Sequence, residues 1–113
     1  MLVLFDQGTP VPIREFLREH KIETAYERKW DKLKNGDLLK AAQEAGFEVL
    51  VTPDKNIRYQ QNLKNYAIAI VVLGDSQWPV LRHHVDRVVA AVNAAKPGTY
   101  CEVEIPEEAS DAG

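Results

Sequence analysis

The chain has little cysteine and no long apolar run. Its single cysteine, Cys101, excludes an internal disulfide and a zinc site built from a cysteine cluster, and it indicates a reducing cytoplasm. Alternation with Val103 and Ile105 predicts that the Cys101 side chain packs in the core. No stretch approaches the roughly 20 apolar residues of a membrane helix, and no basic segment followed by a long apolar stretch marks a secretory signal. We therefore expect a cytoplasmic protein without a membrane partner.

Two further absences narrow the chemistry. No glycine-rich loop of the kind that cradles phosphates is present, and no placement of Ser, His and Asp suggests a nucleophilic triad. The net charge of -3 argues against strong general affinity for nucleic acid. However, residues 28–64 hold eight Lys/Arg and five Asp/Glu, whereas the remainder holds six and twelve. This asymmetry permits a local phosphate-binding surface, although a solvated charged face gives the same pattern.

What the chain does have is an alternation of strand and helix patterns. Short apolar runs predict five strands, at residues 2–5, 22–26, 47–52, 66–73 and 100–105. The unbroken run at 66–73 is typical of a central strand buried on both faces. We expect one domain over residues 1–106, a three-layer α/β/α sandwich with a mainly parallel five-stranded sheet. An acidic, disordered tail is expected at 107–113.

Three helices are expected between these strands, and residues 56–64 could form a further short, polar helix. The first follows Thr9, whose side chain can cap it. The second ends at Gly46, because glycine readily takes the left-handed conformation that closes a helix. The third runs from Trp78 until Pro97 and Gly98 stop it, with its apolar residues on one face.

Aspartates recur where this sheet is expected to end. Right-handed crossovers place the C-terminal ends of parallel strands along one rim. Asp6 follows the first strand, Asp54 follows the third, and Asp37 starts the helix that leads into the third, so we expect these carboxyl groups to lie close together. Grouped carboxylates repel one another, and a hard cation such as Mg²⁺ or Mn²⁺ relieves the conflict. Each aspartate alone could instead cap a helix or shape a turn, as we expect of Asp75.

Two segments resemble a known family, the PIN-like nuclease domains. "LVLFDQGTP" at 2–10 resembles the family's opening strand, in which a hydrophobic run ends in Asp before a short polar turn and Pro. "GDLLKAAQEAGFEVLVTPDKNI" at 36–57 resembles its most characteristic segment, in which Asp, an apolar-periodic helix, Gly, a strand ending in Val-Thr and Asp follow in order. The similarity extends from Met1 to about Leu73, and it is to the short stand-alone domains found as predicted toxins of bacterial toxin–antitoxin pairs.

The resemblance implies an endoribonuclease that depends on Mg²⁺ or Mn²⁺. The family's acidic positions fall on Asp6, Asp37 and Asp54, which would be both catalytic residues and metal ligands. The implied partners are an RNA substrate and a cognate antitoxin, with a homodimer as a further option. Many relatives carry another acid where this chain has Asn56, and longer PIN domains hold a mid-chain Glu, for which Glu27 is a candidate substitute. A catalytically weak or inactive module that binds an antitoxin or another protein therefore stays open.

Basic and aromatic side chains suggest where RNA would bind. The candidate residues are Lys29, Trp30, Lys32, Lys55 and Arg58. The first three lie in "RKWDKLK" at 28–34, where basic groups can hold phosphates and an aromatic ring can stack on an unpaired base. The alternative is a solvated loop whose Trp30 covers the core. The last two stand beside the third aspartate, where they could face the scissile phosphate or be plain surface charges.

A phospho-acceptor receiver domain also places aspartates at this rim. A receiver domain has an acidic pair next to its first strand and a lysine after its last strand. Here Phe5 and Gln7 flank Asp6, and Pro106 follows the last strand. The receiver interpretation therefore rests on fold analogy alone.

Overall fold

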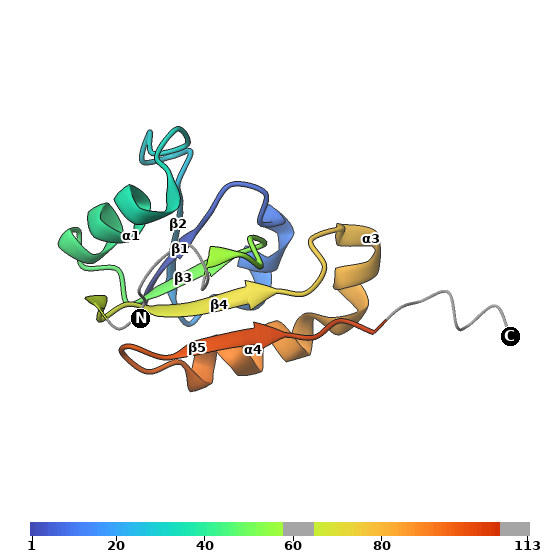
Figure 1. Ribbon diagram of the computed structural model, residues 1–113. Coiled ribbons are helices and arrows are strands. Elements are labelled where there is room, and N and C mark those ends of the chain that lie inside the picture. The colour runs from blue at the N-terminus through green and yellow to red at the C-terminus, as the bar shows by residue number, and fades with distance from the viewer. Residues whose placement is uncertain (58–64, 107–113) are drawn as a thin grey trace, which may run out of the picture.

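A five-stranded sheet forms the centre of the computed structural model, which describes residues 1–57 and 65–106 (Figure 1). The strands are β1 (Leu2–Phe5), β2 (Lys21–Thr24), β3 (Val49–Thr52), β4 (Ala69–Leu73) and β5 (Tyr100–Val103). They lie in the order β2-β1-β3-β4-β5, and each neighbouring pair is parallel. The α/β fold with five strands is thus confirmed, and the sheet is wholly rather than mainly parallel. The tail expected at 107–113 and residues 58–64 of the possible short helix lie outside the described residues.

The strands in the middle of the sheet are buried on both faces. Every residue of β3 and of β4 is buried, as continuous apolar runs predict for parallel strands. The strand expected at 66–73 is shorter, and it lies inside the sheet between β3 and β5. Its five residues have no polar alternation because both of their faces contact apolar side chains.

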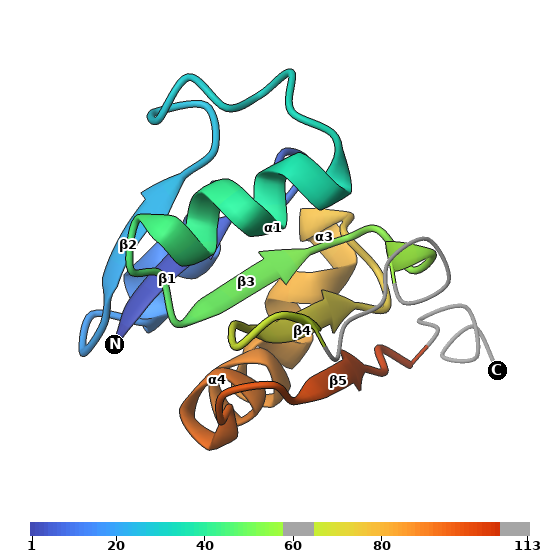
Figure 2. The ribbon, with the colours of Figure 1, turned by 60° about the vertical axis from the view of Figure 1, so that its left-hand side comes forward.

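Alternate strand residues belong to two separate hydrophobic clusters. Phe5 and Val51 lie in one cluster, together with Val88 and Val92 of α4 (Val85–Ala94). The other cluster contains strand residues such as Leu4 and Leu50, together with side chains of α1 (Asn35–Glu44). Figure 2 shows α1 over one face of the sheet and α4 on the other side. Burial of the apolar faces of these helices against the sheet is the main stabilising contribution.

The helix α1 ends as the sequence predicts. Gly46 has φ +90°, and its N–H donates to Gln43 O at 3.1 Å. The N–H of Phe47 donates to Ala42 O at 3.0 Å. These two bonds satisfy carbonyl groups of the last turn in the Schellman arrangement.

The first helix differs from expectation. It is a 3-10 helix, η1 (Val11–Phe16), and no side chain caps it. The Thr9 hydroxyl is buried and donates to Val51 O at 3.0 Å instead. Thr9 therefore ties the loop after β1 to β3, because a buried hydroxyl needs a hydrogen-bond partner and the Val51 carbonyl supplies it.

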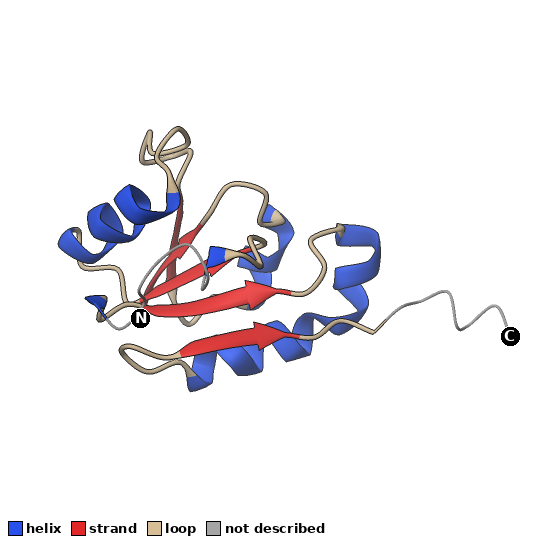
Figure 3. Ribbon diagram, viewed as in Figure 1, coloured by secondary structure: helices blue, strands red, loops and turns tan. Residues whose placement is uncertain are grey.

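The expected continuous helix after β4 is interrupted. It consists of α3 (Trp78–Leu81), the 3-10 segment η3 (Arg82–His84) and α4, which follow one another in blue between β4 and β5 in Figure 3. His84 has φ -131° and ψ 22°, outside the helical region, so the chain changes direction there while Leu81 and Val85 stay buried. Among residues 1–57 and 65–106, no helix is long and apolar enough to cross a membrane.

The expected packing of Cys101 is wrong. The cysteine is exposed, and of the four residues in β5 only Val103 is buried. β5 is an edge strand, and Val103 belongs to the hydrophobic cluster that includes Val88 and Val92 of α4, whereas Cys101 does not. Alternation in the sequence identified the correct face at Val103 but could not show how far the cover extends.

Candidate functional site

The strand order reverses between β1 and β3. From β1 the sheet continues to β2 on one side, and from β3 it continues through β4 to β5 on the other. In open α/β sheets, ligands bind in the crevice beyond the C-terminal strand ends at such a switch point. The residues that follow β1 and β3 therefore form the candidate site.

Asp6 is the first residue after β1, and neighbouring groups hold it in place. Its backbone N–H donates to Val51 O at 2.8 Å, which extends the pairing of β1 with β3. Its Oδ1 accepts from the Gln7 N–H at 2.8 Å, and its Oδ2 accepts from the Thr52 hydroxyl at 2.8 Å. Both donors are neutral, and within the described part of the chain no ion pair involves Asp6.

Thr52, the last residue of β3, joins two aspartates. It is fully buried, and its Oγ1 donates to Asp6 and accepts from the Asp54 N–H at 3.1 Å. The Asp54 Oδ1 accepts from the Asn56 N–H at 2.9 Å, so this carboxylate also shapes the turn after β3. One hydroxyl thus links the Asp6 carboxylate to the Asp54 backbone, and the two aspartates are close enough for the charge of Asp54 to act on Asp6.

The Asp6 carboxylate is in an unfavourable position for a charge. Burial raises its pKa above the ordinary value of 3.8, and the Thr52 hydroxyl and the Gln7 N–H oppose this by stabilising the ionised form. The negative charge of Asp54 raises the pKa further. A cation placed between the two carboxylates would relieve both the burial and the repulsion.

Asp37 does not complete the expected set of three carboxylates. It is exposed and lies in the first turn of α1, where a carboxylate interacts favourably with the helix dipole. In the ranges 1–57 and 65–106, no group of three or more His, Cys, Asp or Glu residues is placed to hold a metal ion. The structure therefore brings Asp6 and Asp54 together and does not bring Asp37 into a group of that kind. The sequence could not decide where Asp37 would lie, because a ten-residue loop at 25–34 separates β2 from α1 and its path is not fixed by any local pattern.

A hollow of about 250 Å³ opens beside Asp6, and Tyr26 is one of its walls. Thr24 and the exposed Val11 also line it. The sequence predicted Tyr26 within the second strand, but β2 ends at Thr24 and Tyr26 lies in the turn that follows, with 75% of its surface exposed. The pattern Thr-x-x-Glu at 24–27 is the signal that could have revealed this, since it favours the start of a helical turn.

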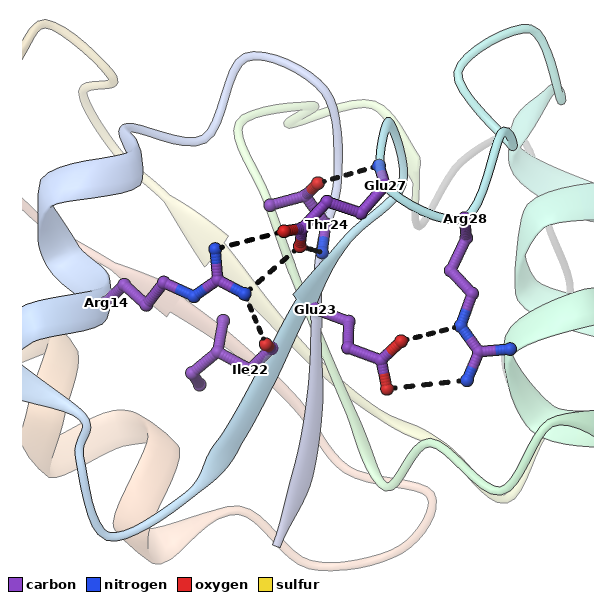
Figure 4. Close-up of polar contacts among 6 residues, drawn as sticks. All are labelled: Arg14, Ile22, Glu23, Thr24, Glu27 and Arg28. Carbon is purple, nitrogen blue, oxygen red and sulfur yellow. Dashed lines mark hydrogen bonds and ion pairs between the residues drawn. The ribbon is translucent and has the colours of Figure 1, made fainter.

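The turn after β2 is held by a reciprocal capping arrangement (Figure 4). The Glu27 N–H donates to the Thr24 Oγ1 at 3.0 Å, and the Thr24 N–H donates to the Glu27 Oε1 at 2.9 Å. Arg14 pairs with Glu27 at 3.1 Å and donates to Ile22 O at 2.7 Å. The Thr24 N–H, followed by Arg14, lowers the pKa of Glu27. Glu27, the candidate substitute for a missing metal-binding acid, is thus engaged in holding this turn.

Trp30 covers the core. It is half-buried, and its ring meets Phe47 edge-on with centroids 6.0 Å apart. The Arg28 guanidinium lies 5.3 Å from the Trp30 centroid and pairs with Glu23 at 2.8 Å. This packing agrees with the alternative interpretation of the sequence, in which Trp30 covers the core. A base-stacking role for Trp30 stays a prediction.

The lysines nominated for RNA binding lie on different parts of the surface. Lys29 and Lys32 are exposed, and Lys29 lines a hollow of about 500 Å³ next to Tyr26. Lys55 is exposed as well, but it lines a separate hollow with Arg87 on the β5 side. Lys29 therefore lies near the hollow that contains Asp6, because Tyr26 lines both that hollow and the one that contains Lys29. Arg58 lies outside the described residues.

Asp75 has the structural role expected of it. Its Oδ1 accepts from the Gln77 N–H at 2.7 Å, immediately before α3. This side-chain bond mimics a backbone turn and orients the entry to the helix. Asp75, which follows β4, thus provides a structural counterpart to Asp6, which follows β1.

Comparisons of the chain with protein-family models, with curated proteins and with solved structures gave no match. The similarity to PIN-like domains stays a prediction from the sequence. The geometry around Asp6 and Asp54 is what supports a function.

Proposed function

We propose that the chain is a metal-dependent ribonuclease whose site is formed by Asp6 and Asp54, with Thr52 between them. The observation that carries the proposal is the state of the Asp6 carboxylate. It is half-buried with a raised pKa, its hydrogen bonds come from neutral donors, and a second carboxylate lies beside it at the switch point of the sheet. Perturbed groups of this kind gather at functional sites.

The donor atoms suit a hard cation. The two carboxylates offer oxygen alone, and Mg²⁺ is commonly held by one or two carboxylates while water and substrate phosphates fill its other positions. Each Asp6 oxygen accepts one hydrogen bond and keeps a further lone pair for a cation. When bound, Mg²⁺ or Mn²⁺ would polarise the phosphodiester and favour ionisation of the attacking water. Thr52 orients Asp6, and the pairing of β1 with β3 holds the spacing.

An RNA phosphodiester is the substrate that this charge arrangement and the sequence resemblance favour together. A phosphate cannot approach paired carboxylates without a cation between them. The exposed Lys29, beyond Tyr26, adds a positive charge on the approach to the hollow. The resemblance further favours a role as the toxin component of a toxin–antitoxin pair.

A second candidate is a PIN-like module with little or no activity that binds an antitoxin or another protein. Three observations favour it. Asp37 completes no group of three potential metal ligands among the described residues, Arg14 engages Glu27, and Asn56 occupies a position where many relatives carry an acid. Calorimetric titration with Mn²⁺ separates the candidates. Absence of binding at millimolar levels would favour the partner-binding module.

The strand order is also one that receiver domains use. A shared order does not assign a function, because one fold supports many chemistries. Phe5 and Gln7 stand where a receiver needs acidic residues beside the first strand. The residues at the site therefore favour the nuclease over the receiver.

Replacement of Asp6 by asparagine tests the proposal. Wild-type protein should cleave single-stranded RNA slowly with Mn²⁺ or Mg²⁺, and chelation should stop it. Asp6→Asn should lower the rate by more than about 100-fold, because loss of a direct ligand exceeds the effect of losing a ligand's supporting group. Asp75→Asn is the matched control, since asparagine can still accept the Gln77 N–H, and its cleavage rate should match wild type. Equal cleavage by wild type and Asp6→Asn would place the activity elsewhere or in a contaminant.

A further inference from the structure

We propose that Tyr26 is a stacking platform for an unpaired nucleobase adjacent to the phosphate held at Asp6. The inference rests on the proposed function and adds a positioning residue to it. Among the described residues, Tyr26 is the most exposed large hydrophobic side chain, at 75%, with Val11 next at 55%. A ring this exposed contributes little buried apolar surface to the core, so packing does not account for an aromatic residue at this position.

Tyr26 lies between the carboxylates and a basic side chain. It lines both the hollow of about 250 Å³ that contains Asp6 and the hollow of about 500 Å³ that contains Lys29. A single strand of RNA alternates phosphate and base along its length. An aromatic ring between a cation-binding site and a lysine matches that alternation, with a base on Tyr26 and phosphates on either side.

The turn that presents Tyr26 is rigid. Hydrogen bonds between Thr24 and Glu27, each involving a side chain, hold the turn together, and Arg14, which lies outside the turn, pairs with Glu27. A backbone hydrogen bond also spans the turn, from the Trp30 N–H to Ala25 O at 2.8 Å. An aromatic ring on a fixed turn loses little conformational freedom when a base stacks on it, which favours binding.

Lys29 has an unusual backbone in the same turn. Its φ is 63°, in the left-handed region that favours glycine, and its N–H donates to Tyr26 O at 3.0 Å. Within the described residues, no other residue apart from glycine has a positive φ. A lysine kept where glycine would be easier supplies a charge at the edge of the platform, in keeping with strain at a functional position.

A base is a better occupant than a protein surface. One ring face is all that a nucleobase needs, whereas a stable protein interface buries about 800 Å² on each partner. The groups beside Tyr26 in the larger hollow are the charged side chains of Glu27, Lys29 and Asp31, which do not extend the apolar surface. The surroundings therefore favour an isolated stacking contact.

The test measures RNA affinity apart from cleavage. In the Asp6→Asn background with Mg²⁺, fluorescence anisotropy would follow binding of a labelled single-stranded oligonucleotide to the full chain. Adding Tyr26→Ala should raise Kd about tenfold, as expected for one lost stacking contact. Tyr26→Phe should stay within about twofold of its parent, because the ring face is retained. Phe16→Ala is the matched control: Phe16 is 53% exposed, and it lines another hollow, formed with α4 residues.

Each outcome decides between the two proposals. An unchanged Kd for Tyr26→Ala, with melting showing an intact fold, would overturn the platform even if Asp6→Asn abolishes cleavage. Weakened binding with Tyr26→Ala, beside wild type that cleaves no RNA, would keep the platform and reject the nuclease. A parent that binds no single-stranded RNA would overturn the platform, as would an equal loss with Phe16→Ala.

Discussion

Acidic side chains follow neighbouring strands of this protein in two contrasting environments. At the end of β2 and in the turn that follows it, Glu23 pairs with Arg28 at 2.8 Å and Glu27 pairs with Arg14 at 3.1 Å. At the rim formed by β1 and β3, Asp6 accepts hydrogen bonds from neutral groups and faces the charge of another aspartate. The pKa shifts are opposite. The Thr24 N–H, followed by Arg14, lowers the pKa of Glu27, whereas burial, followed by the charge of Asp54, raises the pKa of Asp6 against the lowering effect of its hydrogen bonds.

The contrast separates stabilising charge from functional charge. Ion pairs in the turn are partly exposed, so each contributes modestly, and their main effect is to hold the chain in one conformation. The rim keeps an uncompensated carboxylate partly out of water, which lowers stability when no cation is bound. Among the described residues, the acids of the turn are paired with arginines whereas Asp6 takes part in no ion pair, so the rim is suited to binding a cation.

The largest effect on stability is expected where the rim depends on a single hydroxyl. Thr52→Val removes a buried hydrogen bond to a charged acceptor together with the acceptor of the Asp54 N–H, and it should destabilise the fold by about 2 kcal/mol at neutral pH. Thr9→Val is the matched control, since its buried hydroxyl donates to the neutral Val51 carbonyl, and it should cost about 1 kcal/mol. Urea unfolding of both variants measures the difference. Equal losses would mean that the charge of Asp6 contributes nothing to the Thr52 bond.

A smaller effect is expected in the turn. Thr24→Ala removes the hydroxyl that accepts the Glu27 N–H and should cost about 1 kcal/mol. Thr24→Ser keeps that acceptor and should lie within a few tenths of a kcal/mol of wild type. Thermal melting measures both. A Thr24→Ala variant as stable as wild type would show that the ion pairs hold the turn without the cap.

The smallest expected effect on stability is a difference in pH dependence between the rim at Asp6 and the turn at Glu27. In metal-free solution at neutral pH, Asp6→Asn should raise stability by roughly 0.5 kcal/mol, because it removes a buried, repelled charge. The folded pKa lies above 3.8, so the gain should shrink as the pH falls from that raised value toward 3.8, where the native carboxyl takes up its proton first.

Glu27→Gln should behave in the opposite way. The pKa of Glu27 is lowered, so its contribution is present above the ordinary 4.5 and disappears as the pH falls through the folded value. The variant should therefore be less stable than wild type at neutral pH and equal to it in acid. Chemical denaturation from pH 3 to 7, in chelator, follows both variants. A gain for Asp6→Asn that grows on acidification would contradict the account of the rim.

Much of the site follows from local patterns. A buried apolar run that ends in a polar residue marks the end of a strand, and parallel strands end along one rim, so Asp6 and Asp54 could be placed together in advance. Tyr26 could not, because alternation continued past Thr24 while the capping bonds ended the strand there. The interruption at His84 was likewise hidden, since the apolar residues on both sides of it keep a helical spacing.

By itself, the sequence determined the five strands, the end of α1 at Gly46 and the rim at which acidic residues follow β1 and β3. These features depend on residues close together in the chain, through side-chain alternation and the left-handed preference of glycine. The tertiary structure alone decided that β1 lies beside β3, that Thr52 bonds to Asp6 across 46 residues, and that Asp37 joins no metal-binding group of three acids within the described residues. Such pairings depend on which faces are buried together, and no local pattern contains that information.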